Sequence, residues 1–203
     1  MKKIVLVCSH LYSGSSVLCD ALNNHPRIQG FQFGKQNPYT SPLGLLNLSN
    51  KPHKMNNRSA IYMDELLKNQ ELSTKAAYKN CKFIYVVREP GPVLDFMVSN
   101  DRIKPIFAAR YYSFRLRRLC EMAKRTPGAV LVTWEDLLTT RFLPMIEDYL
   151  ELKQSINYDP QCLSSLQRTF SSDLVGASLR SDAESSHEKY LYFLKSQEIQ
   201  HWT

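Results

Sequence analysis

The chain has 203 residues, of which 43% are hydrophobic and 22% are charged. This length favours a single domain over residues 1–203, and this composition is typical of a globular protein rather than a disordered, collagen-like or coiled-coil chain. No window approaches about 18 consecutive apolar residues, so no membrane-spanning helix is predicted. Lysine and arginine outnumber the acidic residues by 26 to 19, a formal net charge of +7 that suits either an anionic partner or an ordinary solvated surface.

The cysteines number five and form no C-x-x-C pair. An odd number at such wide spacing argues against a disulfide framework and against a zinc site. We therefore expect a reducing, cytoplasmic location and no metal. The apolar run that follows Lys3 is too short for a signal peptide and is interpreted as a first buried strand.

The first elements are a strand and a helix joined by a polar turn. Residues 3–8 are apolar and rich in β-branched side chains, which predicts a strand buried on both faces. After the turn at 9–16, apolar residues recur at helical spacing, and the helix should end before Pro26. Residues 30–58 show no periodicity and contain several glycines and prolines, which is typical of a functional or mobile segment.

The middle of the chain predicts further helices and a second strong strand. Residues 59–80 are expected to be helical in part, with a possible strand over 60–63. Residues 82–87 predict a buried strand. A helix is expected to start at Pro92 or Val93, because proline suits the first turn of a helix.

The longest predicted helix covers residues 105–125 and has one apolar and one basic face. The basic residues are Arg110, Arg117, Arg118 and Arg125. A solvated helix face is favoured over a stripe that binds an anionic acceptor or nucleic acid. Beyond Pro127 and Gly128, residues 129–133 predict a third strand. The last helices are expected over 141–151 and 186–200.

The alternation of strands and helices predicts an α/β fold of three layers, with a central, mostly parallel sheet flanked by helices. Ligands of such sheets bind beyond the carboxyl ends of the strands. The turns after Cys8, Val87 and Thr133 are therefore the places to look for a site.

The turn from Ser9 to Ser16 joins the first strand to the first helix. Backbone N–H groups at a helix start have no partner in the helix, and the helix dipole favours an anion there. Gly14 lets the backbone approach a ligand, while Ser13, Ser15 and Ser16 add hydroxyl donors. The turn predicts a phosphate or sulfate cradle, with an unliganded helix cap as the alternative. It differs from the nucleoside-triphosphate loop G-x-x-x-x-G-K-[ST], because a serine stands at position 15 in place of the lysine.

Two later turns carry further candidates. Arg88 directly follows the strand at 82–87, so its guanidinium can fork onto a phosphate or form a salt bridge. After the third strand, Trp134 is expected to pack, and Glu135 or Asp136 to cap a helix.

Together, these motifs resemble those of the sulfotransferases that use 3′-phosphoadenosine 5′-phosphosulfate (PAPS). The run Ser13-Gly14-Ser15-Ser16, followed by Asn23-Asn24-His25-Pro26, resembles their 5′-phosphosulfate loop. The strand at 82–87 with Arg88-Glu89-Pro90 resembles their 3′-phosphate motif, and residues 130–137 are similar to a later strand ending in [YW]-E-D-L. The resemblance covers about a third of the chain and implies a P-loop-like, nucleotide-binding fold.

What the resemblance implies is transfer of a sulfuryl group from PAPS to a hydroxyl or amine of a small molecule or glycan, with no metal and no nucleic acid. The residues implied to bind PAPS, or its product PAP, are Tyr12, Ser13, Gly14, Ser15, Ser16, Arg88 and Ser99. The catalytic base is expected to be His53, then Glu65 or Asp64. His10 could instead contact the sulfuryl oxygens, and His25 is expected to be structural.

The chain departs from the family pattern in four respects. Tyr12 stands where a lysine or arginine usually precedes S-G. Phe96 stands where a serine commonly shares the 3′-phosphate, and Ser99 is the nearest serine. No acidic residue lies over 30–33, and the chain is short, so that part of the acceptor site would be reduced or borrowed from a partner subunit.

Other function classes therefore stay open beside the enzyme. One is a relative that binds PAP, another anion or a protein without catalysis. A small P-loop kinase is disfavoured by the missing lysine. A nucleic-acid binder is disfavoured because basic and aromatic residues interleave only over 110–118.

Overall fold

The computed structural model describes residues 4–31, 59–64, 81–167, 175–196 and 200–201. They include a six-stranded sheet in the order β2-β3-β1-β4-β5-β6, in which every neighbouring pair of strands is parallel. The strands are β1 (Ile4–Ser9), β2 (Ile28–Phe31), β3 (Ser59–Asp64), β4 (Cys81–Val87), β5 (Val130–Thr133) and β6 (Gln200–His201).

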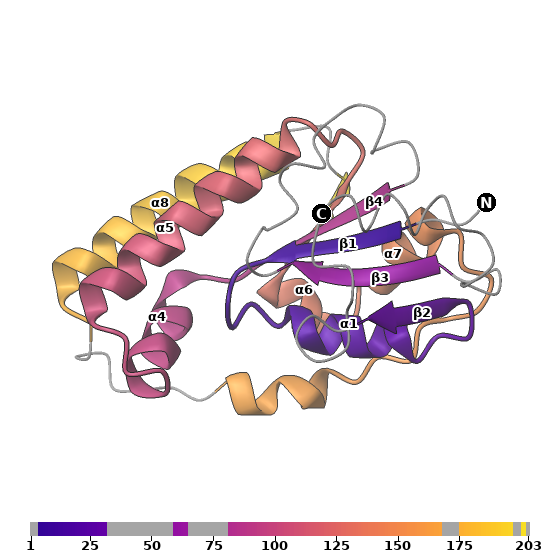
Figure 1. Ribbon diagram of the computed structural model, residues 1–203, viewed down its shortest axis with the longest axis horizontal. Helices are drawn as coiled ribbons and strands as arrows, with labels where there is room; N and C mark the ends of the chain where they lie inside the picture. Colours follow the sequence, from indigo (N-terminus) through magenta and orange to yellow (C-terminus); the bar gives the residue numbers. More distant parts are fainter. Residues whose placement is uncertain (1–3, 32–58, 65–80, 168–174, 197–199, 202–203) are drawn as a thin grey trace.

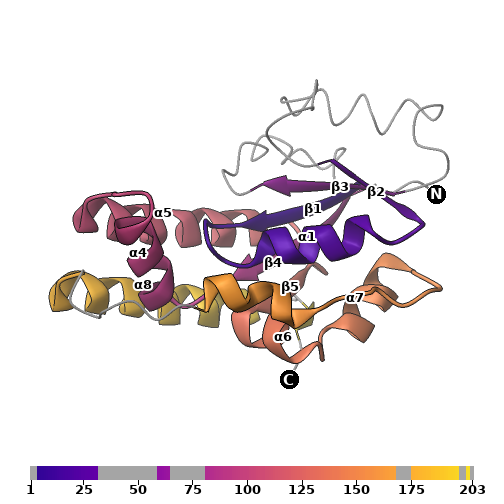
Figure 2. The same cartoon turned by 90° about the horizontal axis from the view of Figure 1, so that it is seen from below.

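Helices cover both faces of this sheet (Figures 1 and 2). One face packs against α1 (Ser15–Asn23), α6 (Trp134–Thr139), α7 (Leu143–Leu150) and the 3-10 helix η3 (Pro160–Leu166). The other packs against α4 (Pro90–Ser99), α5 (Pro105–Ala123) and α8 (Ala177–Ser196). The predicted α/β architecture with a parallel sheet between two layers of helices is confirmed.

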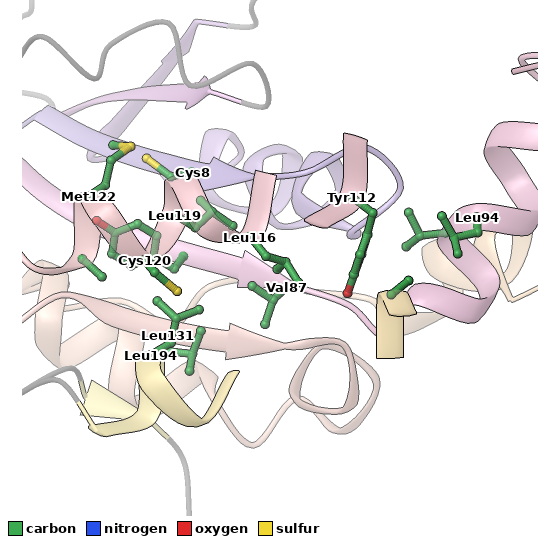
Figure 3. Packing of buried hydrophobic residues seen from close by; sticks show 14 of the residues in the cluster. Cys8, Val87, Leu94, Tyr112, Leu116, Leu119, Cys120, Met122, Leu131 and Leu194 are labelled. Atoms are coloured by element: carbon green, nitrogen blue, oxygen red, sulfur yellow. The ribbon is translucent and has the colours of Figure 1, made fainter. Parts of the chain in front are cut away.

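The central strands are apolar on both faces because both faces are covered. In β1, Val5 and Val7 pack towards α1, whereas Leu6 and Cys8 pack towards α5, and none of the four is more than 1% exposed. Figure 3 shows the second of these clusters, in which the inner face of α5 meets β4 and α8. A strand buried on both sides requires a continuous apolar run instead of alternation, which is why β1 and β4 are visible in the sequence.

Several elements differ from the sequence-based expectation. Ile28–Phe31 forms β2 at the start of a region expected to lack elements. Ser59–Asp64 forms β3, which contains the possible strand expected over 60–63 within a region expected to be helical in part. Both strands are short; β2 pairs with β3 and β3 pairs with β1, over long separations in the chain. Such non-local pairing leaves no periodic pattern within one short window.

The helix boundaries differ in the same way. α8 spans Ala177–Ser196 in place of the expected 186–200, and among its residues only Ala183 and Leu194 are fully buried. This sparse burial explains why its apolar pattern is weak. α4 begins at Pro90, two residues earlier than expected. In the described part of the chain, no helix is long and apolar enough to cross a membrane.

Candidate functional site

The carboxyl ends of three adjacent strands bring the sequence motifs to one edge of the sheet. In the strand register, Ser9 of β1 lies opposite Val86 of β4, and Val87 lies opposite Thr133 of β5. The turn after β1, Arg88 after β4 and Trp134 after β5 therefore start at the same level. This arrangement was predicted from the alternation of strands and helices.

The turn after β1 enters α1 through Gly14, the N-cap residue, whose φ is 89°. Ser13 and Ser15 are buried, Ser16 is exposed, and the hydroxyl of Ser9 donates to that of Ser15 over 2.9 Å. Ser15 and Ser16 open the helix, so their N–H groups have no acceptor within it. With the positive end of the helix dipole, this geometry favours an anion at the turn.

Gly14 has a second role that the sequence did not reveal. A Cβ atom added there would lie 2.7 Å from Cδ1 of Leu137, 3.0 Å from Cζ3 of Trp134 and 3.3 Å from Cδ2 of Leu163. Its Cα–H therefore faces apolar side chains of α6 and η3. Packing under α6 and the positive φ both require glycine, in addition to any approach of a ligand to the backbone.

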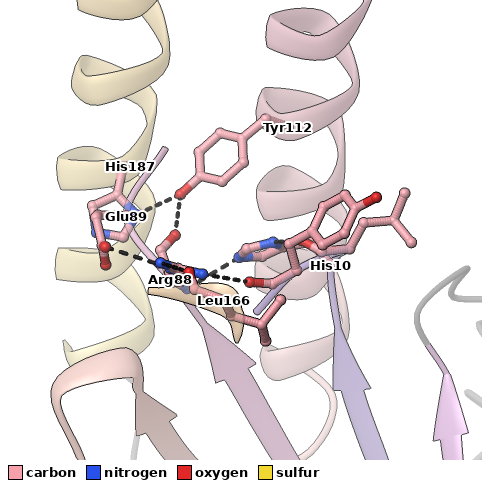
Figure 4. Close-up of polar contacts among 8 residues, drawn as sticks. His10, Arg88, Glu89, Tyr112, Leu166 and His187 are labelled. Atoms are coloured by element: carbon pink, nitrogen blue, oxygen red, sulfur yellow. Dashed lines mark hydrogen bonds and ion pairs between the residues drawn. The ribbon is translucent and has the colours of Figure 1, made fainter. Parts of the chain in front are cut away.

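Arg88 is 2% exposed and lies against the turn (Figure 4). Its Nη1 donates to the carbonyl of Tyr12 over 3.3 Å, and its Nη2 donates to the carbonyl of Leu166 over 2.8 Å. Nε lies 3.5 Å from Oε1 of Glu89. These three contacts use three of the five N–H groups that a guanidinium carries.

Trp134 connects the three motifs. The guanidinium carbon of Arg88 lies 3.7 Å from the centre of the Trp134 ring, a cation–π arrangement. The same ring lies beside Gly14. The expectation that Trp134 packs is confirmed, and so is the cap: Thr133 and Asp136 form a capping box at the start of α6.

Arg115 of α5 is a site residue that the sequence analysis missed. It is 3% exposed, and its Nη2 donates to the carbonyl of Ser9 over 2.8 Å. Two buried guanidiniums, Arg88 and Arg115, thus contact the backbone of the turn, and their positive charge favours an anion there. The sequence feature that could have identified Arg115 is its position next to Leu116, on the apolar face of the helix. Arg110 and Arg117, by contrast, are exposed.

Tyr12 takes part through its backbone and directs its side chain away from the turn. The ring stacks on Phe96 of α4 with ring centres 5.1 Å apart, and its hydroxyl donates to Oδ1 of Asp101 over 2.7 Å. Tyr12 and Phe96, which are two of the four departures from the family pattern, therefore contact each other. Ser99 ends α4, and its Oγ is buried with no hydrogen-bond partner among the described residues.

His10 and His25 both have structural contacts. His10 is fully buried: Nε2 accepts from the N–H of Arg88, so Nδ1 carries the proton that is donated to the carbonyl of Leu11. Burial lowers the pKa of His10 to about 4. His25 accepts from the N–H of Arg27 and contacts the carbonyl of Gln154, as expected of a structural residue.

The candidates for the catalytic base are only partly described. His53 and Glu65 lie outside the described residues. Asp64 is the last residue of β3, level with Cys8 of β1, and so stands at the same edge of the sheet as the turn. His187 of α8, which the sequence analysis did not consider, contacts the hydroxyl of Tyr112 near Arg88 (Figure 4).

The sequence matches no family model and no curated protein. Among solved structures, the sulfotransferase domain from the Synechococcus PCC 7002 olefin synthase is similar, with a TM-score of 0.64 and 16% identity over 95% of both chains. This chain has a sulfotransferase fold. The mouse sulfotransferase SULT7A1 complexed with PAP also matches, with a TM-score of 0.40 and 14% identity over 94% of this chain and 67% of that one.

Proposed function

We propose that this protein transfers a sulfuryl group from PAPS to a hydroxyl or amine acceptor. The observation that carries the proposal is the contact between the turn at 9–16 and the buried guanidinium of Arg88, at the carboxyl edge of a sheet with the sulfotransferase fold. A donor that is phosphorylated at both its 3′ and 5′ positions needs two anion sites on one edge.

Each part of the site has a role in this proposal. The N–H groups of residues 14–16 and the hydroxyls of the turn hold the 5′-phosphosulfate, while the N–H of Ser13 donates to the carbonyl of His10. Arg88 holds the 3′-phosphate with the N–H groups that its protein contacts do not use. Ser99, whose Oγ needs a partner, is a candidate second contact for that phosphate. Arg115, which contacts the carbonyl of Ser9, supplies positive charge next to the turn, whereas the side chain of Tyr12 supplies none.

The reaction itself requires one proton to leave the acceptor. The acceptor oxygen or nitrogen forms a bond to sulfur, and the bond from sulfur to the bridging oxygen of the 5′-phosphate breaks, with its electron pair staying on that oxygen. Charge on the sulfuryl group is stabilised by oriented N–H groups and guanidiniums. The acceptor's proton passes to a base on the protein, for which His53, Glu65 and Asp64 remain candidates.

Calorimetric titration with PAP and with adenosine 5′-phosphosulfate tests the proposal. Arg88→Ala should weaken the affinity for PAP by about ten- to a hundredfold, because a charge-assisted hydrogen bond contributes roughly 1.5–3 kcal/mol. It should hardly change the affinity for adenosine 5′-phosphosulfate, which lacks the 3′-phosphate. Arg88→Lys should recover only part of the loss, since lysine lacks the planar fork.

The exposed Arg117 provides a matched control, because Arg117→Ala removes the same charge at a side chain that is 56% exposed. It should leave both affinities unchanged. Equal losses for both ligands in Arg88→Ala would make Arg88 a structural residue only, and would remove the support for a PAPS site.

A relative that binds PAP without catalysis is the second candidate. The contact of Tyr12 with Phe96 and Asp101 favours it. Position 12 holds a tyrosine in place of the usual lysine or arginine, so this position gives the turn no positive charge. Release of PAP from PAPS in the presence of an acceptor panel separates the two candidates. The enzyme releases PAP in proportion to the acceptor, whereas the non-catalytic relative binds PAP and releases none.

A further inference from the structure

A cavity of about 380 Å³ lies beyond the carboxyl ends of β4 and β5, beside α8. Its lining includes Glu89, Thr133, Glu135, His187, Leu191 and Lys195. Small-molecule pockets typically measure about 300–1,000 Å³ and combine apolar walls with a few polar groups. The cavity therefore has the size of a small-molecule pocket, and its lining is mainly polar, with Val87 and Leu191 as the apolar residues.

The hydrogen bonds of Tyr112 fix the protonation of His187. The hydroxyl of Tyr112 donates its only proton to the carbonyl of Arg88 over 2.5 Å. The same oxygen lies 2.8 Å from Nδ1 of His187, so it must accept a proton that Nδ1 carries. A neutral imidazole with its proton on Nδ1 has its basic lone pair on Nε2. His187 thus presents a proton acceptor on the ring edge away from Tyr112.

Glu89 offers a second acceptor to the same cavity. Its Oε1 faces Nε of Arg88, whereas its Oε2 is shielded from solvent and has no hydrogen-bond partner among the described residues. Burial raises the pKa of Glu89 above its usual value. A buried carboxylate oxygen without a donor is unfavourable, and a ligand with an N–H or O–H group would satisfy it.

We propose that this cavity binds the sulfuryl acceptor, a small molecule whose hydroxyl or amine donates hydrogen bonds to Oε2 of Glu89 and Nε2 of His187. During transfer, Nε2 of His187 takes the acceptor's proton while the acceptor atom bonds to sulfur and the bridging oxygen of PAPS leaves. This inference rests on the proposed function. Arg88 links the two sites, since it contacts Glu89 on one side and the turn at Tyr12 on the other.

The charges around His187 determine its behaviour with pH. Burial, the largest effect, lowers its pKa below the usual value, and Lys195 acts in the same direction. Glu135 of α6 and Glu188 of α8 oppose this shift.

The other titratable groups near the ring are Asp136 and Glu89 in the cavity lining, Tyr112, and His10, which interacts electrostatically with His187. The net effect keeps the imidazole neutral at neutral pH, the form that a proton acceptor needs.

The first arm of the test is binding, and it does not require turnover. The probes are 2-phenylethylamine and its matched alcohol 2-phenylethanol, observed through the long-range ¹H–¹⁵N spectrum of the histidines. We expect a proton on Nδ1 of His187 in the free protein and a shift of Nε2 when either probe is added. The amine should bind more tightly, because carboxylates outnumber Lys195 in the lining. A proton on Nε2, or signals of His187 that neither probe moves, overturns the assignment.

The second arm uses His187→Asn, whose amide N–H keeps the donor to Tyr112 but has no basic nitrogen. It should lower kcat by about 100-fold or more, the usual contribution of a positioned base, and leave PAP affinity within about twofold. In the unmodified protein we expect kcat to fall towards acid pH as His187 becomes protonated, and this fall should disappear in the variant. Glu184→Gln, an exposed change on the same helix, is the control.

The two arms separate failure of this inference from failure of the proposed function. If PAP binds and His187→Asn transfers sulfate at the unmodified rate, the inference is wrong while the proposed function stands. If the probes bind at His187 but PAP does not bind at the turn, the proposed function is wrong, and with it the proton-transfer role, while the cavity remains a ligand site.

Discussion

At the scale of single residues, Gly14 is held by two constraints at once. Its φ of 89° is unfavourable for any side chain, and an added Cβ would lie 2.7 Å from Leu137. Gly14→Ala should therefore destabilise the protein by about 2–4 kcal/mol, the sum of backbone strain and overpacking. Urea unfolding followed by circular dichroism measures this loss.

Gly128 is a matched control for Gly14. Its φ is also positive, at 74°, but no atom lies within 4 Å of an added Cβ. Gly128→Ala should cost only the backbone strain, about 1 kcal/mol. If Gly14→Ala proves no more destabilising than Gly128→Ala, the contact of Gly14 with α6 does not constrain the turn.

His10 makes the stability of the protein depend on pH. Burial lowers its pKa to about 4 in the folded state, whereas an exposed histidine in the unfolded chain titrates near pH 6.5. Between these values the unfolded chain binds the extra proton, so the free energy of unfolding should fall as pH drops from about 6.5 to 4, by about 3 kcal/mol in total. Above pH 6.5 this contribution is fully present.

Comparison with His10→Gln isolates that contribution. Glutamine keeps an acceptor for the N–H of Arg88 but does not titrate. Denaturant unfolding at several pH values should give a shallower dependence for the variant, with the remaining slope including His187, whose pKa is also lowered. Parallel curves for both proteins would show that His10 is not buried in the neutral form.

At the scale of elements, one buried ion pair attaches α8 to α4. Nη2 of Arg180 lies 2.8 Å from Oδ1 of Asp95, whose side chain is 8% exposed. Asp95→Ala removes a buried carboxylate that faces the guanidinium and should destabilise the protein by about 3–5 kcal/mol. The control is the exposed Glu121, which lies 3.9 Å from Arg117 and 2.8 Å from Arg118, and Glu121→Ala should cost about 1 kcal/mol or less. Similar losses in thermal unfolding would contradict this difference in burial.

The sequence predicted some elements well, for identifiable physical reasons. β1, β4 and α5 carry their own signal, because a doubly buried strand needs a continuous apolar run and a half-buried helix needs an apolar stripe. β2, β3 and β6 are short, and their partners come from distant parts of the chain. The existence of β2 and β6 depends on the assembled sheet, so local patterns could not reveal them, whereas the apolar run over 60–63 did indicate a possible strand at β3.

At the scale of the whole molecule, the position of the site was predictable but its side-chain contacts were not. The parallel sheet brings the turn at 9–16, Arg88 and Trp134 to one edge, as the alternation of strands and helices indicated. The engagement of Arg88 by the carbonyls of Tyr12 and Leu166 depends on η3, which arrives from the far end of the chain. His187 reaches Tyr112 from α8 by the same kind of distant contact.

Because these distant elements meet at one edge, a ligand bound there should stabilise the folded chain as a whole. Binding to the native state alone raises its stability by about 2.7 kcal/mol when the ligand is at 100 times its Kd. For a chain of this length that corresponds to an increase in Tm of roughly 5–10 °C. We expect this shift with PAP, because its two phosphates match the turn and Arg88.

ATP should give little or no shift at the same concentration, because it has no 3′-phosphate for Arg88 and the turn lacks the lysine that binds β- and γ-phosphates. The shift in Tm with inorganic sulfate, at a matched ionic strength, measures anion binding at the turn alone. Arg88→Ala should reduce the shift in Tm with PAP towards this value. Differential scanning calorimetry of both proteins with the three ligands measures this. Equal shifts in Tm with PAP and ATP would mean that the site binds only the 5′-phosphates of its ligands, so Arg88 would have no part in selecting the donor.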